Sequence, residues 1–369
     1  MPSKTFIKIL IFVILILGIG FYFLKNSENN RSLAQKEIIP ENKTTTEENS
    51  ISKNITIGWV GDIVPSMVKD NTDNYPDIFS NVKENISQPD IMIGNLEGTL
   101  ANADTNSKCK VITTNCFAFR GPSSFAKNLK DAGFDFISLA NNHAFDYEAI
   151  GYADTKKALD DIFLPHSLDN GNISTIKING KNVGIVGFSS YLWTNDFTKD
   201  DIVKNLVAKS KKENDITIVI FHGGAEGINK NHVPQGTEYY LNENRGDLRA
   251  FAHSAIDSGA DLVLGSGPHV LRGMEFYKDK LIAYSLGNFA GYKTPVKTKG
   301  ALGTSAILSV TLSPLGIFQM GTITPITVSD DGIPNLNNPD TLSTIQSLST
   351  ADFPTTYAKI SDTGEIKEY

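Results

Sequence analysis

The chain has 369 residues, of which 40% are hydrophobic and 20% are charged, and its formal net charge at pH 7 is −7. This length suits one large domain or two medium ones, and the composition excludes a chain that is disordered throughout. The acidic balance offers no basic footprint for a phosphate backbone, so nucleic acid is not an expected partner.

The N-terminus carries an apolar run from Phe6 to Leu24 in which Lys8 is the only charged residue. As a helix this run spans roughly 28 Å, close to the ~30 Å hydrocarbon layer of a bilayer. We expect residues 1–25 to form a cytoplasmic stub and a transmembrane signal anchor, with a cleaved signal peptide as the alternative. Both alternatives export the rest of the chain. The expected location is therefore the cell membrane, with a single pass and an extracytoplasmic globular domain.

Residues 26–53 are polar, lack aromatic side chains and show no periodic apolar face. This composition predicts a flexible linker between the membrane and the globular part. The globular part is expected over residues 54–330. Residues 331–369 are expected to form a C-terminal extension that packs on the domain or trails from it.

Within the globular part, short β-rich runs alternate with amphipathic stretches, a pattern typical of a layered α/β fold. Buried strands are expected at 55–60, 90–95, 135–141, 215–222 and 260–265. Helices are expected over 76–86, 122–133, 147–162 and 244–259. Hairpins are expected to turn at Asn179-Gly180, at Lys278-Asp279 and at 314–316. The first part thus predicts parallel strands with helical crossovers, and the later part adds hairpins.

The two cysteines, Cys109 and Cys116, are separated by six residues in one polar segment. Outside the cytoplasm two thiols so close in sequence are expected to form a disulfide. A metal site at this pair is disfavoured, because no histidine and no second cysteine pair lies near it in sequence.

Short polar motifs follow five of the predicted strands. Ligands of open α/β sheets gather at the carboxyl ends of the strands, so these side chains are expected to meet. Mixed oxygen and imidazole donors suit Mn, Zn or Fe, as one ion or two. Each residue type also has an alternative role. Asp62 could be a turn aspartate, Glu97 could bind a substrate amine or an arginine, and the histidines could be structural. The expected metal ligands are Asp62, Glu97, Asn142, His222 and His269.

Taken together, the motifs resemble those of the CapA family, which is named for poly-γ-glutamate capsule synthesis and is similar to calcineurin-like metallophosphatases. The resemblance covers most of residues 55–290 and implies a four-layer α/β/β/α sandwich of metallophosphatase type. The matching segments are GWVGDIVPS, GNLEGTL, FAFRGP, SLANNHAFDY, FHGGAEG, AIDSGADLVLGSGPHVLRGMEFY and KLIAYSLGNF.

The resemblance also implies roles for individual residues. Glu97 would bridge two metals where the phosphatases use aspartate, and the Asn142 oxygen would bind metal. His143 would face the leaving group, oriented by Asp146. The chain departs from the pattern because Ser266-Gly267-Pro268 precedes His269, so the partner imidazole is missing and the ligand count is lower. The residues expected to contact substrate are Arg120, Glu226, Arg272 and Asn288.

The function that follows is that of a membrane-anchored, extracytoplasmic CapA-like protein. It would act in synthesis, export or anchoring of an anionic capsular polymer such as poly-γ-glutamate, as a metal-dependent hydrolase of phosphoesterase type. The alternative is a non-catalytic subunit that binds the polymer and works with the other subunits of a membrane capsule synthase. The sequence leaves the choice between enzyme and binding subunit open.

Overall fold

The computed structural model describes residues 53–65, 77–101, 106–109, 116–167, 169–295 and 298–368. The predicted anchor, and the predicted linker up to residue 52, lie outside these ranges. Among the helices within the ranges, none combines the length and the apolar character needed to cross a bilayer.

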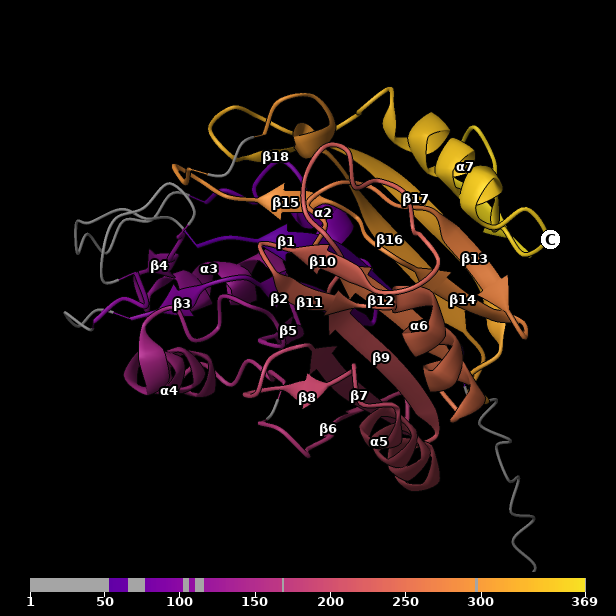
Figure 1. Ribbon diagram of the computed structural model, residues 1–369, viewed down its shortest axis with the longest axis horizontal. Coiled ribbons are helices and arrows are strands. Elements are labelled where there is room, and N and C mark those ends of the chain that lie inside the picture. Colours follow the sequence, from indigo (N-terminus) through magenta and orange to yellow (C-terminus); the bar gives the residue numbers. More distant parts are fainter. Residues whose placement is uncertain are drawn as a thin grey trace, which may run out of the picture. The chain divides into compact units, whose positions relative to one another are not determined.

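Two large sheets dominate the described chain (Figure 1). The first has nine strands, and its parallel neighbours lie toward one end of the strand order. Its main order is β19 (Lys359–Ile360), β20 (Glu365–Lys367), β17 (Phe318–Val328), β16 (Thr304–Leu312), β1 (Ile55–Ile63), β2 (Ile91–Leu96) and β5 (Phe136–Ser138). Off this path, β15 (Asn288–Ala290) pairs with β1, and β18 (Pro334–Leu336) pairs with β17.

The second sheet has seven strands, of which four neighbours run parallel. Its main order is β13 (Met274–Tyr277), β14 (Lys280–Ala283), β12 (Leu262–Ser266), β9 (Ile216–His222), β7 (Lys181–Ser189) and β6 (Ser174–Ile178), with β8 (Asn195–Asp196) on β7. Two short ribbons pair β3 (Thr99–Leu100) with β4 (Arg120–Gly121), and β10 (Glu238–Tyr240) with β11 (Glu243–Gly246).

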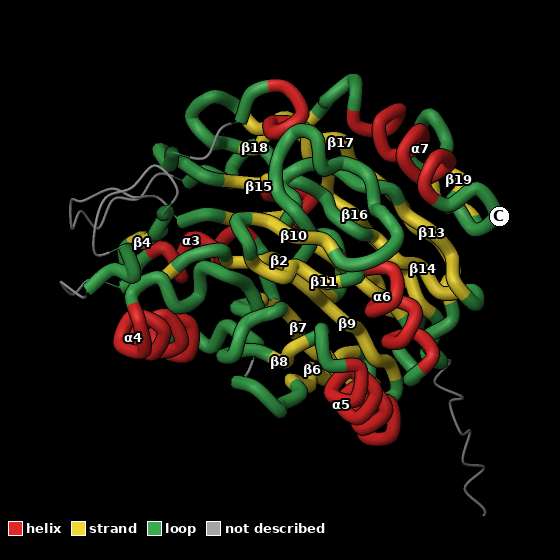
Figure 2. Tube along the Cα trace, viewed as in Figure 1, coloured by secondary structure: helices red, strands yellow, loops and turns green. Residues whose placement is uncertain are grey.

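The helices lie outside the two sheets (Figure 2). Three pack on the outer face of the first sheet: α2 (Lys83–Ile86), α3 (Phe125–Ala132) and α4 (Glu148–Asp160). Two pack on the outer face of the second: α5 (Asp200–Glu213) and α6 (Leu248–Asp257). The order is therefore helix, sheet, sheet, helix. A further helix, α7 (Thr341–Asp352), packs Ile345 into the core between the sheets, and η1 (Gly300–Gly303) leads into β16.

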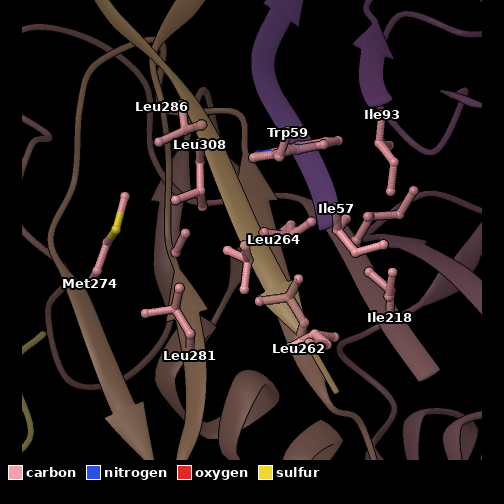
Figure 3. Close-up of a cluster of buried hydrophobic side chains, with 14 of the residues drawn as sticks. Ile57, Trp59, Ile93, Ile218, Leu262, Leu264, Met274, Leu281, Leu286 and Leu308 are labelled. Atoms are coloured by element: carbon pink, nitrogen blue, oxygen red, sulfur yellow. The ribbon is translucent and has the colours of Figure 1, made fainter. Parts of the chain in front are cut away.

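The core between the sheets is built from the inward-facing residues of both (Figure 3). Along β1, Ile55, Ile57 and Trp59 face this core, as the period-two alternation of a strand requires. Trp59 is buried, and its indole Nε1 donates a hydrogen bond of 3.1 Å to the carbonyl of Gly265 in the second sheet. This bond fixes where the end of β1 lies relative to the end of β12.

Most predicted elements are present. The Asn179-Gly180 turn joins β6 to β7, and both turn residues have positive φ, as does the Lys278-Asp279 pair between β13 and β14. Helix α3 ends at Gly133, whose φ of 106° is left-handed, as expected of a glycine after a helix. The helix predicted at 76–86 is shorter: only Lys83–Ile86 is helical, preceded by turns.

One further difference concerns the helix predicted over 244–259. Residues 244–246 belong to strand β11, so the helix predicted from 244 begins at Leu248, where Asp247 accepts a hydrogen bond from the backbone of Ala250. The C-terminal segment is part of the domain, because β20 pairs with β17 and places Ile366 in the core between the sheets. Helix α5 was not predicted.

Candidate metal centre

The end of β1 presents Asp62 to the carboxyl edge of the first sheet. Asp62 is paired in register with Asn95 on β2 and with Asn288 on β15, and the pairing is irregular between Trp59 and Asp62. Gly61 permits this arrangement, since a Cβ there would lie 1.9 Å from the carbonyl oxygen of Gly287. The same carbonyl accepts a hydrogen bond of 3.0 Å from the Asp62 amide. The glycine before Asp62 is thus required for the close approach of the β15 segment.

The second sheet delivers two histidines to the same place. His222 is the last residue of β9 and is paired in register with Ser266 at the end of β12. The chain then turns through Gly267, whose φ of 118° suits glycine, and where a Cβ would lie 2.6 Å from the carbonyl oxygen of Gly223. His269 itself has a φ of 60°, an uncommon conformation for this residue type. The turn directs the imidazole back toward the first sheet.

The two sheets meet at a cluster of carboxylates and imidazoles. Asp62 Oδ2 lies 3.0 Å from Nδ1 of His269, and Asp62 Oδ1 lies 3.6 Å from Nδ1 of His222. Glu97 Oε1 lies 3.6 Å from Nε2 of His222, 3.7 Å from Nε2 of His269 and 3.8 Å from Nε2 of His143. Side chains separated by up to 207 positions therefore converge within a few ångströms.

Several polar atoms of this cluster are buried without a hydrogen-bond partner in the described chain. They are both carboxylate oxygens of Glu97, Nε2 of His222, and the side-chain oxygens of Asn142 and Asn288. Buried polar atoms of folded proteins are almost always satisfied, so a group of orphans in one place indicates a missing partner. A cation fits this set, because every one of these atoms can act as a ligand.

Asp62, Glu97 and His269 each offer a ligand atom within 4.8 Å of the others and can together hold a metal ion. His222 faces Asp62 with Nδ1 and Glu97 with Nε2. Asn142, the residue before His143, has a buried side-chain oxygen without a hydrogen-bond partner in the described chain. All five predicted ligands are thus buried or nearly buried. The donor set of oxygen and imidazole matches that of first-row divalent metals.

Two asparagines hold the cluster in place. Asn95 donates from Nδ2 to Asp62 Oδ1 at 2.8 Å and accepts at Oδ1 from Nδ2 of Asn141 at 3.0 Å. Asn141 also donates to the carbonyl of Leu96 and accepts from the amide of His143. Asn95 was not singled out from the sequence, although it stands two positions before Glu97. These bonds tie the ends of β1 and β2 to the loop that carries His143.

The charges of the cluster favour an added cation. Burial raises the pKa of Glu97 well above its usual range, and the nearby carboxylates of Asp62, Glu226 and Asp146 raise it further, against the lowering effect of His269. Burial alone lowers the pKa of His269, but the surrounding carboxylates outweigh it and raise the pKa well above the ordinary value. Burial raises the pKa of Asp62, yet its two imidazole neighbours lower it overall. The acidic groups thus recruit positive charge.

His143 and Asp146 form a buried pair beside the cluster. His143 Nδ1 lies 2.7 Å from Asp146 Oδ2, and the Nε2 atom faces Glu97. Burial lowers the pKa of His143, partly opposed by Asp146. Asp146 thus contacts the imidazole that it was predicted to orient, and the other ring nitrogen faces Glu97, one of the candidate metal ligands.

The predicted disulfide is confirmed: Cys109 and Cys116 are joined, with 5.8 Å between their Cα atoms. Cys116 and the neighbouring Phe117 border a cavity beside His143.

Two cavities adjoin the cluster, and His143 and Glu226 line both. The larger has a volume of about 370 Å³ and also touches Asn142 and Arg245. The smaller, of about 220 Å³, also touches His269 and Asn288. A molecule in either cavity lies next to the imidazole of His143.

The wall of the larger cavity contains stacked rings. Phe145 stacks on Trp193 at 4.8 Å between centroids, and Trp193 stacks on Tyr191 at 5.1 Å. The guanidinium of Arg245 lies over the ring of Tyr191 at 5.8 Å and over that of Tyr240 at 5.4 Å. Arg245, which is not among the residues predicted to contact substrate, is one of the described residues that line this cavity.

The predicted substrate contacts fall into two groups. Glu226 lines both cavities, with Oε1 at 2.8 Å from Nη1 of Arg245 and Oε2 at 3.6 Å from Nε2 of His269. Burial raises its pKa, but His269 and Arg245 outweigh burial and lower it to about 2. Asn288 reaches the smaller cavity and donates from Nδ2 to the carbonyl of Leu302. Both therefore lie where a ligand would touch them.

The two arginines preferred from the sequence lie elsewhere. Arg272 is fully buried and binds both oxygens of Glu238 at 2.8 and 2.7 Å, with a further bond to the carbonyl of Lys230. Its donors hold the loop before β10, so its prediction as a substrate contact is corrected to a structural role. Arg120 lies 4.8 Å over the ring of Tyr147 and is not among the described residues that line either cavity.

Comparison with known proteins gives a consistent family match. The family model described as "Bacterial capsule synthesis protein PGA_cap" matches residues 56–293. The chain is 29% identical over 311 residues to the capsule biosynthesis protein CapA of Bacillus anthracis, covering 76% of this chain and 71% of that one. It is 33% identical over 180 residues to the PGA biosynthesis protein CapA of Bacillus subtilis, covering 44% of each.

Among solved structures, a 5'-nucleotidase precursor from Thermus thermophilus aligns with a TM-score of 0.40 at 13% identity. The alignment covers 78% of this chain and 55% of that one. A likeness at this score carries no inference about activity.

Proposed function

This chain belongs to the family of bacterial capsule synthesis proteins, PGA_cap, and we propose that it acts in synthesis, export or anchoring of an anionic capsular polymer such as poly-γ-glutamate. We propose further that it does so as a metal-dependent hydrolase of phosphoester or amide bonds. The observation that carries the second proposal is the convergence of Asp62, Glu97, His222 and His269 beside the His143–Asp146 pair.

The residues of the cluster fit a divalent cation, held by Asp62, Glu97 and His269, with His222 and Asn142 as further ligands of the same or a second ion. Mn, Zn and Fe suit these donors, and the donor set does not select among them. Such an ion supplies Lewis-acid polarisation of the substrate and a nucleophile at neutral pH.

The chain's own residues supply positioning and proton transfer. Asp146 holds Nδ1 of His143, so Nε2 takes up a proton and delivers it to the leaving group. Glu226 and Asn288 contact the substrate in the cavities, and the cation of Arg245 stands at the wall of the larger one. The buried position of the cluster strengthens each of these electrostatic interactions.

We propose that the domain works outside the cytoplasm, tethered to the membrane by residues 1–25 through the linker 26–53. The apolar run from Phe6 to Leu24 and the disulfide both support this placement, since disulfides persist in oxidising compartments. Subunits of a membrane capsule synthase are the partners expected at this location.

A second candidate function is a non-catalytic subunit that binds the polymer. It is favoured by one observation: the three residues before His269, which are Ser266, Gly267 and Pro268, offer no imidazole to the cluster, and the Ser266 hydroxyl donates to the carbonyl of Phe221. A site with fewer strong ligands binds metal more weakly. Weak metal binding is enough for a subunit that recognises the polymer without hydrolysing it.

Metal analysis and hydrolysis assays on the full-length protein test the proposal. We expect the purified protein to bind Mn²⁺ or Zn²⁺ and to hydrolyse bis(4-nitrophenyl) phosphate, and His222→Ala to lose both. His232→Ala is the matched control, because His232 is exposed and bonded to Asp352 outside the cluster. Metal binding without hydrolysis would favour the binding subunit, and the absence of both would reject the hydrolase.

A further inference from the structure

The disulfide lies next to the His143–Asp146 pair. Three donors of the described chain reach the fully buried carboxylate of Asp146. Oδ2 lies 2.7 Å from His143 Nδ1 and accepts a 2.6 Å hydrogen bond from the amide of Phe119, while Oδ1 forms a 2.6 Å ion pair with Nζ of Lys108. Two of these donors stand on the two segments that the Cys109–Cys116 bond joins.

Further contacts come from the same two segments. The amide of Lys108 donates to the backbone carbonyl of Asp146 at 2.8 Å, and Nζ of Lys108 is 3.5 Å from the carbonyl of Asn142. On the other side, the ring of Phe119 packs against the imidazole of His143 at 4.4 Å between centroids. The backbone and the side chain of Asp146, and one face of His143, are therefore fixed by residues within three positions of a half-cystine.

These contacts do not belong to the packed cores. Lys108 retains 36% of its side-chain exposure and Phe117 is 47% exposed, whereas Phe119 is buried, so burial holds only the Phe119 end of the second segment and does not hold the segment of Lys108. Segments of this kind keep a defined position only when something ties them. The disulfide ties them to each other, and Asp146 ties both to the loop of His143.

We propose that Cys109 and Cys116 close a cradle that positions His143 for proton transfer, with Lys108 as the positioning residue that acts through Asp146. Here the cradle means residues 106–109 and 116–119 together. Lys108 neutralises the buried Asp146 carboxylate and fixes its Oδ1, which leaves Oδ2 directed at His143 Nδ1. The catalytic meaning of this device rests on the proposed hydrolase; the positioning itself does not.

Reduction of the bond by a dithiol transfers two electrons and two protons to the cysteines, oxidises the dithiol to its disulfide and removes the cross-link between the two segments. Lys108 and Phe119 then lose their common constraint, and His143 samples other orientations. Removing a partner group that orients the imidazole of such a site typically lowers activity about 10- to 100-fold.

The experiment compares full-length oxidised protein, Cys109→Ser/Cys116→Ser and Lys108→Met, with Lys108→Arg as the conservative variant. Lys156→Met is the matched control, because it removes a lysine–carboxylate pair with Asp169 outside the cradle. The first readout is the low-field proton resonance of His143 Nδ1–H bonded to Asp146, assigned by its loss in Asp146→Asn. The second is kcat and KM for bis(4-nitrophenyl) phosphate with Mn²⁺.

We expect the resonance to be lost or broadened in the serine variant and in Lys108→Met, retained in Lys156→Met and restored in Lys108→Arg. We expect kcat to fall about 10- to 100-fold with KM changed less than about twofold. Lys108→Met keeps the disulfide, so it still tests whether the cradle positions His143 if the serine variant fails to fold. An unchanged resonance in both variants would overturn the proposal. If wild-type protein hydrolyses nothing, the hydrolase fails while the resonance still tests the cradle.

Discussion

The indole of Trp59, in the first sheet, donates its Nε1 hydrogen to the carbonyl of Gly265, in the second, across 206 positions of sequence. Trp59 stands three residues before Asp62, and Gly265 stands one residue before Ser266, the register partner of His222. The bond therefore aligns the two strand ends whose side chains form the candidate metal centre. This contact links the packing of the core to the geometry of the site.

Trp59→Phe is expected to destabilise the protein by about 1–3 kcal/mol, because the buried carbonyl of Gly265 loses its donor. Metal affinity should fall as well, since the strand ends lose their alignment. Urea unfolding and metal titration of the variant measure the two effects. Trp193→Phe is the control. It removes the indole hydrogen bond to the carbonyl of Asn141, which is only partly buried, and should lower the unfolding free energy by less. A change in unfolding free energy below about 0.5 kcal/mol for Trp59→Phe would contradict this role.

Glu97→Gln should have opposite effects with and without metal. In metal-free protein, burial and the neighbouring carboxylates raise the pKa of Glu97, so the charged form of this side chain is unfavourable. Replacing it with an uncharged amide should leave the stability of the metal-free protein unchanged or increase it. In wild-type protein, metal at a hundredfold excess over its Kd adds about 2.7 kcal/mol of stability, which the variant should lose. Thermal unfolding with EDTA and with Mn²⁺ compares them, with the exposed Glu243→Gln as control. A variant that keeps the Mn²⁺ response would exclude Glu97 as a ligand.

Arg272→Met should be among the more damaging substitutions, although Arg272 is not among the described residues that line the two cavities beside the cluster. It leaves the carboxylate of Glu238 buried without its partner, which costs about 3–5 kcal/mol. Lys278→Met breaks an exposed pair with Asp257 and should cost at most about 1 kcal/mol. Denaturant unfolding distinguishes them, and the double variant Arg272→Met/Glu238→Gln should recover part of the loss. Stable Arg272→Met protein with impaired ligand binding would instead restore the substrate role.

Stability should fall in acid partly through Glu275. Burial raises the pKa of this carboxylate, but hydrogen bonds from His253, Thr356 and Tyr284 outweigh burial and lower it below 4.5. Because the folded pKa is below the unfolded one, the stabilisation is complete above about pH 4.5 and is lost as the pH falls through the folded pKa.

Glu275→Gln should therefore flatten the dependence of the unfolding free energy on pH below about pH 4.5. Glu84→Gln, at an exposed position of α2, should leave the wild-type slope unchanged. Urea titrations at several pH values provide the slopes, and equal slopes for wild type and Glu275→Gln would refute the assignment.

The parts of the fold that were predicted from sequence are those with local signals. Alternating β-rich runs identify the central strands, and Asn179-Gly180 fixes a hairpin because both residues accept positive φ. Helix α5 was missed because its buried positions, Val203, Val207 and Ser210, form a narrow stripe among lysines. Strands such as β20, which span three residues, are too short to show alternation, and their pairing with β17 is decided by tertiary contacts.

The site divides in the same way. Asp62 and Glu97 could be predicted to meet because the parallel strands β1 and β2 bring their carboxyl ends to one edge. His222 ends a strand of the other sheet, and the packing of the two sheets brings it to the same place. The sequence held no signal that Asn95 would join Asp62 to Asn141, or that Lys108 would reach Asp146. Arg272 could not be told from a substrate contact, because its partner Glu238 lies 34 positions away and only folding brings the two together.

The most direct test of the metal centre is anomalous diffraction from crystals grown with Mn²⁺. We predict an ion within about 2.0–2.4 Å of a Glu97 oxygen, with Asp62 and with His222 or His269 among its other ligands. Crystals in which the cluster binds no ion at saturating Mn²⁺, or in which the ion lies away from Glu97, would contradict the account.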